Sequence, residues 1–199
     1  MLNAPKIAPA DPGRLRGPAS GAVTPEGVAQ SLAALMPENA IIIDEAISFG
    51  RGFFPATHPA PPHDWMMLTG GAIGDGIPMA VGAAIAAPDR RVIALQADGS
   101  AMYSLAGLWT QARERLNVTT IILANRKYAI LLNELAGVGA NPGRTAMDML
   151  DLSNPSLDWC QLAGGMGIPA ARAASLDELN THLSASVQRD GPFLIELLI

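Results

Sequence analysis

The fold of this chain is decided by residues 91–131, which read RVIALQADGSAMYSLAGLWTQARERLNVTTIILANRKYAIL. Two largely apolar runs within this stretch, 92–95 and 118–124, are rich in β-branched residues. Such runs are typical of strands that are buried between two layers of helices. The stretch therefore predicts two strands that run parallel in one sheet and are joined by a right-handed crossover.

The crossover between these strands is predicted to be an amphipathic helix. Its buried face is marked by apolar residues at helical spacing, namely Leu105, Leu108, Trp109, Ala112 and Leu116. Its other face is largely filled by Gln111, Arg113, Glu114 and Arg115. We expect this helix to begin close to Ser100, directly after the first strand.

Polar residues stand where each of the two strands ends. Asp98-Gly99-Ser100 follows the first strand, and Asn125 follows the second, 27 positions later. Ligands of open α/β sheets bind at the carboxyl edge of the strands, and two oxygen donors there suit Mg²⁺ with a phosphorylated molecule. Gly99 leaves room for an anion to approach the backbone, and amides from Ser100 onward lie near a helix start. Taken singly, Asp-Gly is also an ordinary turn.

These residues resemble a known motif. The sequence ADGS, a gap of about 25 residues and then an Asn are similar to the thiamine-diphosphate motif of the pyruvate-decarboxylase and acetolactate-synthase superfamily. The resemblance implies that Mg²⁺ is held by the side chains of Asp98 and Asn125 and by the backbone carbonyl of Lys127. Ala97 stands where the family usually has Gly, and Ala124 where it often has a second Asn. Neither replacement removes a metal ligand.

A second motif, GGAIGDGIP at residues 70–78, resembles the family segment that cradles the bend of the cofactor. The resemblance implies that the Gly71 carbonyl accepts a hydrogen bond from the 4′-amino group and that Ile73 wedges under the rings. The folded cofactor can then lose its thiazolium C2 proton and act as an electron sink for a 2-oxo acid. The motif is equally a glycine-rich helix start. The helix that follows is apolar almost all round, which predicts that it is buried.

Further residues are placed at the site by the same resemblance. Ser48 falls where the family contacts the diphosphate, and so do Tyr128 and the amides of Ala129 and Ile130. Ser48 is equally suited to cap a helix. The residues Ile130, Leu131, Glu134 and Leu135 would face the substrate, although their spacing also fits an ordinary amphipathic helix. His58 and His63 lie in a Pro-rich loop, where most histidines are solvated. No catalytic residue is assigned.

The composition fits one enzyme domain. The 199 residues are 49% hydrophobic and carry a net charge of −5, which does not favour binding to nucleic acid or to an anionic membrane. Cys160 is the single cysteine, so no intrachain disulfide can form. The sequence shows neither a signal-peptide pattern nor a membrane span, so we expect a cytoplasmic enzyme domain.

The domain is expected to begin at Thr24. Residues 1–23 are rich in Pro and Gly and are predicted to be a linker or disordered tail. Thr24 can cap a helix with Pro25 in its first turn. Further strands are expected at 40–43, 170–174 and 193–198, and further helices near 157–163 and from 176 to 187. The alternation predicts an α/β domain over residues 24–199, with a parallel sheet of about six strands and helices on both faces.

The resemblance covers residues 24–199 and corresponds to the diphosphate-binding domain of the family. In the family, the glutamate that activates the cofactor lies on a strand of a separate pyrimidine-binding domain. Nothing in this sequence resembles that strand and its glutamate. We therefore expect the diphosphate- and Mg²⁺-binding half of an enzyme for 2-oxo acids, with a pyrimidine-binding domain or subunit as partner and a homo-oligomeric assembly.

The reaction remains open between several alternatives. Acetolactate-synthase-like carboligation is the first, and decarboxylation of the benzoylformate or split sulfopyruvate type is the second. A non-catalytic binding module is the third. A Rossmann site at residues 165–170 is disfavoured, because a strand rather than a helix is expected after its glycines.

Overall fold

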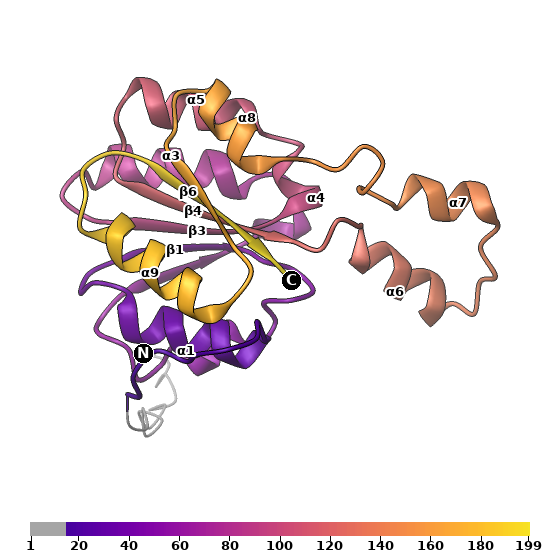
Figure 1. Cartoon of the computed structure of the whole chain (residues 1–199), viewed down its shortest axis with the longest axis horizontal. Helices are drawn as coiled ribbons and strands as arrows, with labels where there is room; N and C mark the ends of the chain where they lie inside the picture. The colour runs from indigo at the N-terminus through magenta and orange to yellow at the C-terminus, as the bar shows by residue number, and fades with distance from the viewer. Residues whose placement is uncertain (1–14) are drawn as a thin grey trace, which may run out of the picture.

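The computed structural model describes residues 15–199 and shows a six-stranded parallel sheet between two layers of helices (Figure 1). The sheet order is β2-β1-β3-β4-β6-β5. The strands are β1 (Ile41–Glu45), β2 (Asp64–Met67), β3 (Val92–Ala97), β4 (Val118–Ala124), β5 (Ala170–Ala173) and β6 (Phe193–Leu198). Every pair of neighbouring strands is parallel, which confirms the predicted fold class.

Helices cover both faces of the sheet. They are α1 (Pro25–Leu35), α2 (Phe53–Ala56), α3 (Gly76–Ala86), α4 (Asp98–Ala101), α5 (Ala106–Arg113), α6 (Ala129–Gly137), α7 (Arg144–Met149), α8 (Trp159–Gly165) and α9 (Leu176–Val187), with a 3-10 turn at Thr69–Gly71. Helices α1 and α9 pack on one face, and α3, α5 and α8 pack on the other. The inner strands β1, β3, β4 and β6 are largely buried on both sides because successive side chains alternate between these two layers.

Helix α1 begins as the sequence predicts. The backbone N–H of Gly27 donates to Thr24 Oγ1 over 3.0 Å, so that Thr24 caps the helix in front of Pro25. Val28 and Leu32 lie on the buried face and join the largest core cluster, which also contains side chains of β1, β3, β4 and β6.

One strand of the sheet was not predicted. Strand β2 lies at the edge of the sheet, pairs with β1, and follows the Pro-rich loop that contains His58 and His63. Three of its four residues are exposed, so its burial pattern does not contrast with that of the loop before it. Strand β1 also extends further than expected, because Asp44 and Glu45 are its last two residues and both are buried.

The predicted crossover helix is interrupted. It starts with the single turn α4 and continues only from Ala106 as α5. Trp109 was expected to be buried but is 53% exposed, whereas Gln111 was expected on the exposed face and is buried. The Gln111 amide oxygen accepts a hydrogen bond from Thr120 Oγ1 of β4. Leu108 and Leu116 are nevertheless buried and Arg113, Glu114 and Arg115 are exposed, so only Trp109 and Gln111 differ from the expected pattern.

Helix α3 is less buried than its apolar sequence predicts. Ala80 and Ala84 pack against the sheet, but Ile85 is 58% exposed. A helix in the outer layer of a three-layer domain has only one neighbouring layer, so its far side stays exposed unless another molecule covers it.

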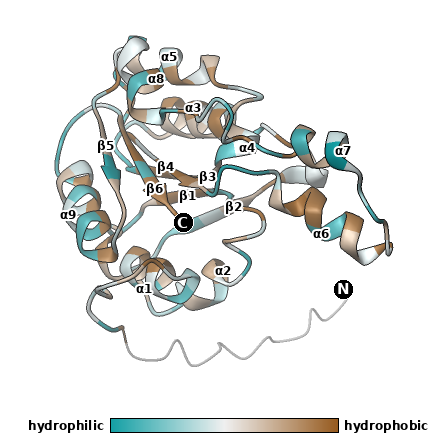
Figure 2. Ribbon diagram, turned by 45° about the vertical axis from the view of Figure 1, so that its right-hand side comes forward, coloured by the Kyte–Doolittle hydropathy of each residue, from teal (hydrophilic) through white to brown (hydrophobic). Residues whose placement is uncertain are grey.

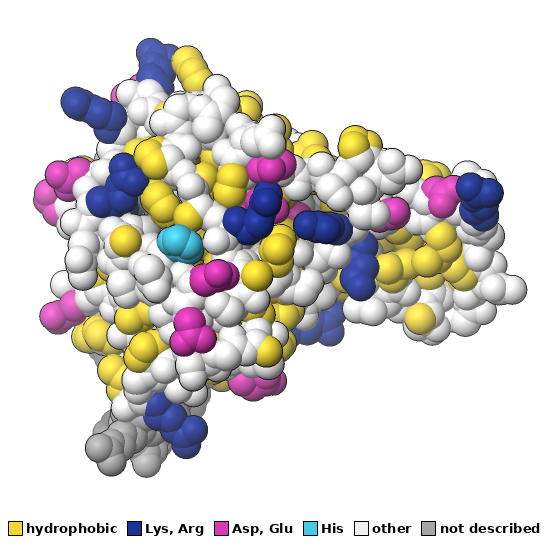
Figure 3. Space-filling model, viewed as in Figure 1, with side chains coloured by type: hydrophobic (Ala, Val, Ile, Leu, Met, Phe, Trp, Pro, Cys, Tyr) yellow, Lys and Arg dark blue, Asp and Glu magenta, His cyan; other side chains and the backbone are white. Residues whose placement is uncertain are grey.

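Helices α6 and α7 form an arm that projects from the body of the domain (Figures 1 and 2). Neither helix contributes a fully buried side chain. Apolar side chains gather on the arm in the space-filling view (Figure 3); the large exposed ones are Leu131, Val138, Met147 and Met149. Between the two helices lies an apolar groove of about 380 Å³.

The predicted linker is described in part, since residues 1–14 lie outside the described residues. Residues 15–23 have no regular secondary structure but bond to the domain. The N–H of Gly21 donates to Asp177, and the Asn180 side chain donates to the carbonyl of Ala19. A domain boundary at Thr24 stays a prediction. No helix within residues 15–199 has the length and hydropathy needed to cross a membrane.

Candidate functional site

A pocket of about 110 Å³ lies at the carboxyl edge of the sheet, beside the ends of β1, β3 and β4. Nine of the predicted site residues line this pocket, namely Ser48, Ile73, Gly99, Ser100, Asn125, Lys127, Tyr128, Ala129 and Ile130. The structure thus brings together side chains from four separate segments of the chain. Asp98 lies beneath the pocket and is 2% exposed. Gly71 does not line the pocket, but it lies two residues before Ile73 in the same loop, residues 70–76, which we call the glycine loop.

The Asp98 carboxylate joins the ends of β3 and β4. Its Oδ1 accepts from the N–H of Gly99 over 2.9 Å, and its Oδ2 accepts from the N–H of Arg126 over 2.6 Å. Burial raises the pKa of Asp98, while the N–H donors of Arg126 and Gly99 and the nearby charge of Arg126 lower it. No lysine or arginine among residues 15–199 forms an ion pair with this carboxylate. The site therefore holds a buried negative charge that is oriented by the backbone.

The loop after β4 wraps around this carboxylate. Arg126 has a left-handed φ of 58°, and the Oδ1 of Asn125 accepts from the N–H of Lys127 over 3.1 Å. The backbones of Lys127 and Asp151 form an isolated antiparallel β-bridge, and the N–H of Tyr128 donates to the carbonyl of Leu150. These bonds fix the direction of the loop, which places the Asn125 amide beside the strand end that carries Asp98.

The glycine loop supplies one wall of the pocket. Gly70, Gly71 and Gly74 have φ values of 61°, 75° and 94°, which L side chains rarely adopt. Ile73 lines the pocket and is 43% exposed. The loop is held from below by Glu45, whose carboxylate accepts from the N–H groups of Gly74 and Gly76. Both oxygens of the Glu45 carboxylate are thus engaged with this loop.

Two tyrosines shape the pocket in a way that the sequence did not indicate. A Cβ added to Gly99 would lie 2.6 Å from the ring of Tyr128, and one added to Gly74 would lie 2.5 Å from the Cβ of Tyr103. The space above Gly99, which we expected an anion to use, is therefore taken by the Tyr128 ring. Sequence reasoning also missed other lining residues, namely Ile47, Phe49, Tyr103, Leu123 and Ile199. Phe49 and Tyr103 lie near the motifs, but no pattern sets them apart from core residues.

The other predicted residues lie partly in the pocket and partly outside it. Ser48 lines the pocket and caps no helix, because α2 starts only after Gly52. Ile130 and Leu131 of α6 line the pocket, whereas Glu134 and Leu135 line the groove between α6 and α7. Neither histidine of the Pro-rich loop lines the pocket: the His58 ring packs on Phe54, and His63 bonds to the carbonyl of Pro61.

The donor set fits a Mg²⁺ ion that bridges to a diphosphate. Carboxylate, amide and backbone carbonyl oxygens are the hard ligands that Mg²⁺ takes, and the ion usually keeps further positions for phosphate and water. The Asp98 carboxylate lacks an ionic partner in the described chain, so a bound cation would compensate its buried charge. The protein is thus a parallel α/β domain whose carboxyl edge carries oxygen donors of the kind that suit a metal ion and a phosphate group.

Sequence comparison identifies the family. Residues 52–197 match the thiamine pyrophosphate enzymes, specifically their C-terminal TPP binding domain, and the chain belongs to this family. The chain is 50% identical over 182 residues to IlvX of Mycobacterium tuberculosis, a protein named after the acetolactate synthase large subunit. That match covers 90% of this chain and 35% of IlvX. Benzoylformate decarboxylase of Pseudomonas aeruginosa is 36% identical, over 89% of this chain and 32% of the enzyme.

Solved structures give the same result. The thiamine diphosphate-dependent 4-hydroxybenzoylformate decarboxylase of Rhodococcus jostii RHA1 superposes with a TM-score of 0.75 at 30% identity. The superposition covers 92% of this chain and 34% of that enzyme. The chain thus spans about a third of the length of these relatives. The predicted family, fold and cofactor class are confirmed.

Proposed function

We propose that this chain binds the diphosphate end of thiamine diphosphate through Mg²⁺ held by Asp98, Asn125 and the carbonyl of Lys127. The observation that carries the proposal is the buried carboxylate of Asp98, which lies at the carboxyl edge of the sheet without an ionic partner among residues 15–199. A divalent cation bound here would neutralise this charge, and Mg²⁺ usually keeps further positions for phosphate oxygens and water.

The other pocket residues have simpler roles in this proposal. Ser48, Ser100 and the amides of Ala129 and Ile130 provide polar groups for the diphosphate, and Gly99 and Tyr128 form the surface beside it. Ile73 would support the rings of the cofactor, and the Gly71 carbonyl would accept a hydrogen bond from its amino group. When bound, thiamine diphosphate supplies an electron sink for chemistry at the carbonyl carbon of a 2-oxo acid.

We further propose that the complete site acts on 2-oxo acids, with acetolactate-synthase-like carboligation as the first candidate. The similarity to IlvX supports it. Decarboxylation of an aromatic 2-oxo acid is the second candidate, supported by the likeness to the two benzoylformate-type decarboxylases. Product analysis separates them, because pyruvate gives acetolactate in the first case and benzoylformate gives benzaldehyde in the second.

The proposed partner is a pyrimidine-binding domain or subunit, which supplies the glutamate that activates the cofactor. The apolar groove of the arm and the exposed side of α3 support an association of this kind, or a homo-oligomer, because large exposed apolar patches mark interaction surfaces. We expect the chain by itself to turn over neither pyruvate nor benzoylformate. Robust turnover without a partner would contradict the half-site proposal.

The binding proposal is tested by calorimetry on the full chain. Thiamine diphosphate is titrated with Mg²⁺ present and with Mg²⁺ removed by EDTA, and thiamine monophosphate and thiamine serve as matched ligands. We expect affinity to depend on both the metal and the second phosphate, because the metal bridges the protein to the diphosphate. Equal affinity for thiamine and thiamine diphosphate, or no effect of EDTA, would contradict the proposal.

A further inference from the structure

The carboxylate of Glu45 holds the glycine loop against the end of strand β1. Its Oε1 accepts from the N–H of Gly74 over 2.5 Å, and its Oε2 accepts from the N–H of Gly76 over 2.9 Å. Glu45 is the last residue of β1 and is 1% exposed. We infer that Glu45 is a positioning residue, which sets the height of Ile73 in the pocket and thereby the affinity for the ring end of the cofactor. This inference rests on the proposed function.

The two bonded glycines can carry no side chain. A Cβ at Gly74 would collide with Tyr103, and a Cβ at Gly76 would collide with the amide of Gln96 and with Glu45 itself. The loop is therefore pressed against three side chains, of which Glu45 is the one that bonds to its backbone. Glu45 and Gln96 are also partners in the register of β1 and β3, so the loop rests on adjacent positions of two central strands.

A buried carboxylate is unfavourable unless it is hydrogen-bonded, and here its partners are the amides of the glycine loop. Burial raises the pKa of Glu45, and the N–H groups of Gly74 and Gly76 lower it in part. A carboxylate in this position is stabilised by two N–H donors at the glycine loop. An apolar residue would avoid the desolvation but would leave both N–H groups without an acceptor. The loop position is thus coupled to one side chain.

The position of this contact predicts that Glu45 affects binding of the cofactor rings and not binding of the diphosphate and the metal. Glu45 bonds on both sides of Asp75, directly after Ile73, and so acts on the wall that faces the cofactor rings. The proposed metal ligands lie on the loops after β3 and β4. Changes at Glu45 should therefore weaken binding of thiamine diphosphate while leaving binding of inorganic diphosphate with Mg²⁺ unchanged.

The variant Glu45→Gln tests this prediction in the full chain. It keeps the size of the side chain but replaces one carboxylate oxygen by an amide NH2, which cannot accept a hydrogen bond from the glycine N–H opposite it. We expect about tenfold weaker binding of thiamine diphosphate, as is usual for residues that act through another group, and unchanged binding of Mg²⁺ with inorganic diphosphate. Asp44→Asn is the matched control, because Asp44 is a buried carboxylate on the same strand that bonds to Ala46 and Trp65 instead.

A second measurement decides the inference without any cofactor. Amide hydrogen exchange should show Gly74 and Gly76 protected in the parent chain and exposed in Glu45→Gln, with unchanged protection in the core strand β4. If the parent binds neither ligand, the proposed function fails, and exchange still reports whether Glu45 holds the loop. Equal exchange of both glycines in parent and variant, or equal affinity for thiamine diphosphate where the parent binds it, would overturn the inference.

Discussion

Two regions of this domain contain buried acidic side chains whose negative charge is balanced in different ways. At the carboxyl edge, Asp98 is held by two backbone N–H groups and has no ionic partner among the described residues. Between α8 and the strands β5 and β6, the ligand atoms of Asp158, Cys160 and Glu196 lie within 4.8 Å of one another. Both groups offer atoms that bind metals, so residue types alone do not distinguish them.

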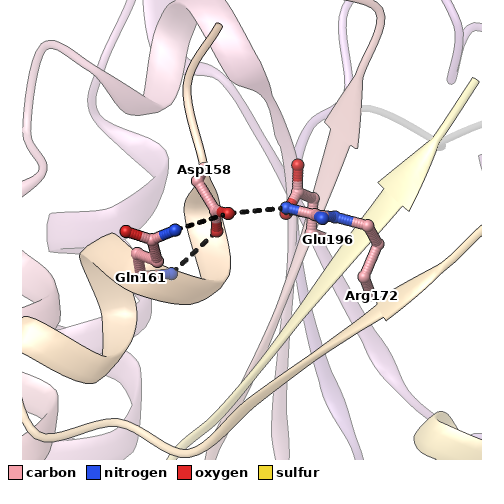
Figure 4. A network of polar contacts seen from close by, with 4 residues as sticks. All are labelled: Asp158, Gln161, Arg172 and Glu196. Atoms are coloured by element: carbon pink, nitrogen blue, oxygen red, sulfur yellow. Dashed lines mark hydrogen bonds and ion pairs between the residues drawn. The ribbon is translucent and has the colours of Figure 1, made fainter.

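The second group already contains its cation. The guanidinium of Arg172 lies 2.9 Å from Glu196 Oε2 and 3.1 Å from Asp158 Oδ2, and Gln161 donates to Asp158 from the other side (Figure 4). An arginine in this position balances the buried charge of Glu196. The comparison teaches that the acidic group beside Arg172 is a weak candidate for a metal site, whereas Asp98 combines a buried carboxylate that lacks an ion pair with a second oxygen donor, Asn125, at the end of the neighbouring strand.

The largest effect is expected from Asp98→Asn. The change removes the proposed charged ligand but keeps the shape of the side chain, so Mg²⁺-dependent binding of thiamine diphosphate should weaken more than about 100-fold, beyond the usual loss for an outer-shell change. Asn125→Ala should act in the same direction but less, because a neutral oxygen contributes less to a hard cation. Calorimetry measures both.

Asp89→Asn is the control for this series, since Asp89 is an exposed carboxylate in the turn before β3, at the opposite edge of the sheet. It should bind thiamine diphosphate like the parent chain. If Asp98→Asn also retained parental affinity, the assignment of the metal to this loop would be wrong.

The next effect concerns the stability contributed by Arg172, which balances the charge of Glu196. Arg172→Met leaves the Glu196 carboxylate buried and without its cation, which should lower the free energy of unfolding by about 1–3 kcal/mol, less than for a fully buried pair because Arg172 is half exposed. Urea unfolding measures the change. The double variant Arg172→Met with Glu196→Gln should recover part of the loss. A fully stable Arg172→Met protein would show that the arginine does not balance this charge.

The smallest effect is on the reactivity of Cys160. Burial, followed by the nearby Glu196 charge, raises the pKa of the Cys160 thiol to about 11. The thiolate is the reactive form, so alkylation by iodoacetamide should be slow at pH 8 and should keep accelerating with a midpoint near pH 11. Cys160→Ser gives the blank, because the chain has a single cysteine. A midpoint near the value of an ordinary thiol would contradict this environment.

The central part of the fold could be predicted from sequence because its signals are local. Strands β3 and β4 are short apolar runs, and a single crossover between them brings Asp98 and Asn125 to the same edge of the sheet. The edge strand β2 could not be found in this way, since three of its four residues are exposed and the loop before it is rich in proline.

The less local features of the site could not be read from the sequence. Glu45 bonds to backbone amides that lie 29 and 31 positions further along the chain, and glycine amides carry no side-chain signal for such a contact. The Tyr128 ring over Gly99 likewise depends on how the loop after β4 turns back. Trp109 is exposed although it continues the helical spacing of the apolar residues, so this spacing alone does not reveal which side chain faces the solvent.

The most direct test of the account is to locate the metal. Crystals grown with Mn²⁺ in place of Mg²⁺ and with thiamine diphosphate would show the ion by its anomalous scattering. We predict one strong peak that is coordinated by Asp98, Asn125 and the carbonyl of Lys127 and by oxygens of the diphosphate. A peak at Asp158, Cys160 and Glu196, or a diphosphate bound at the edge of the sheet without a metal, would contradict the account.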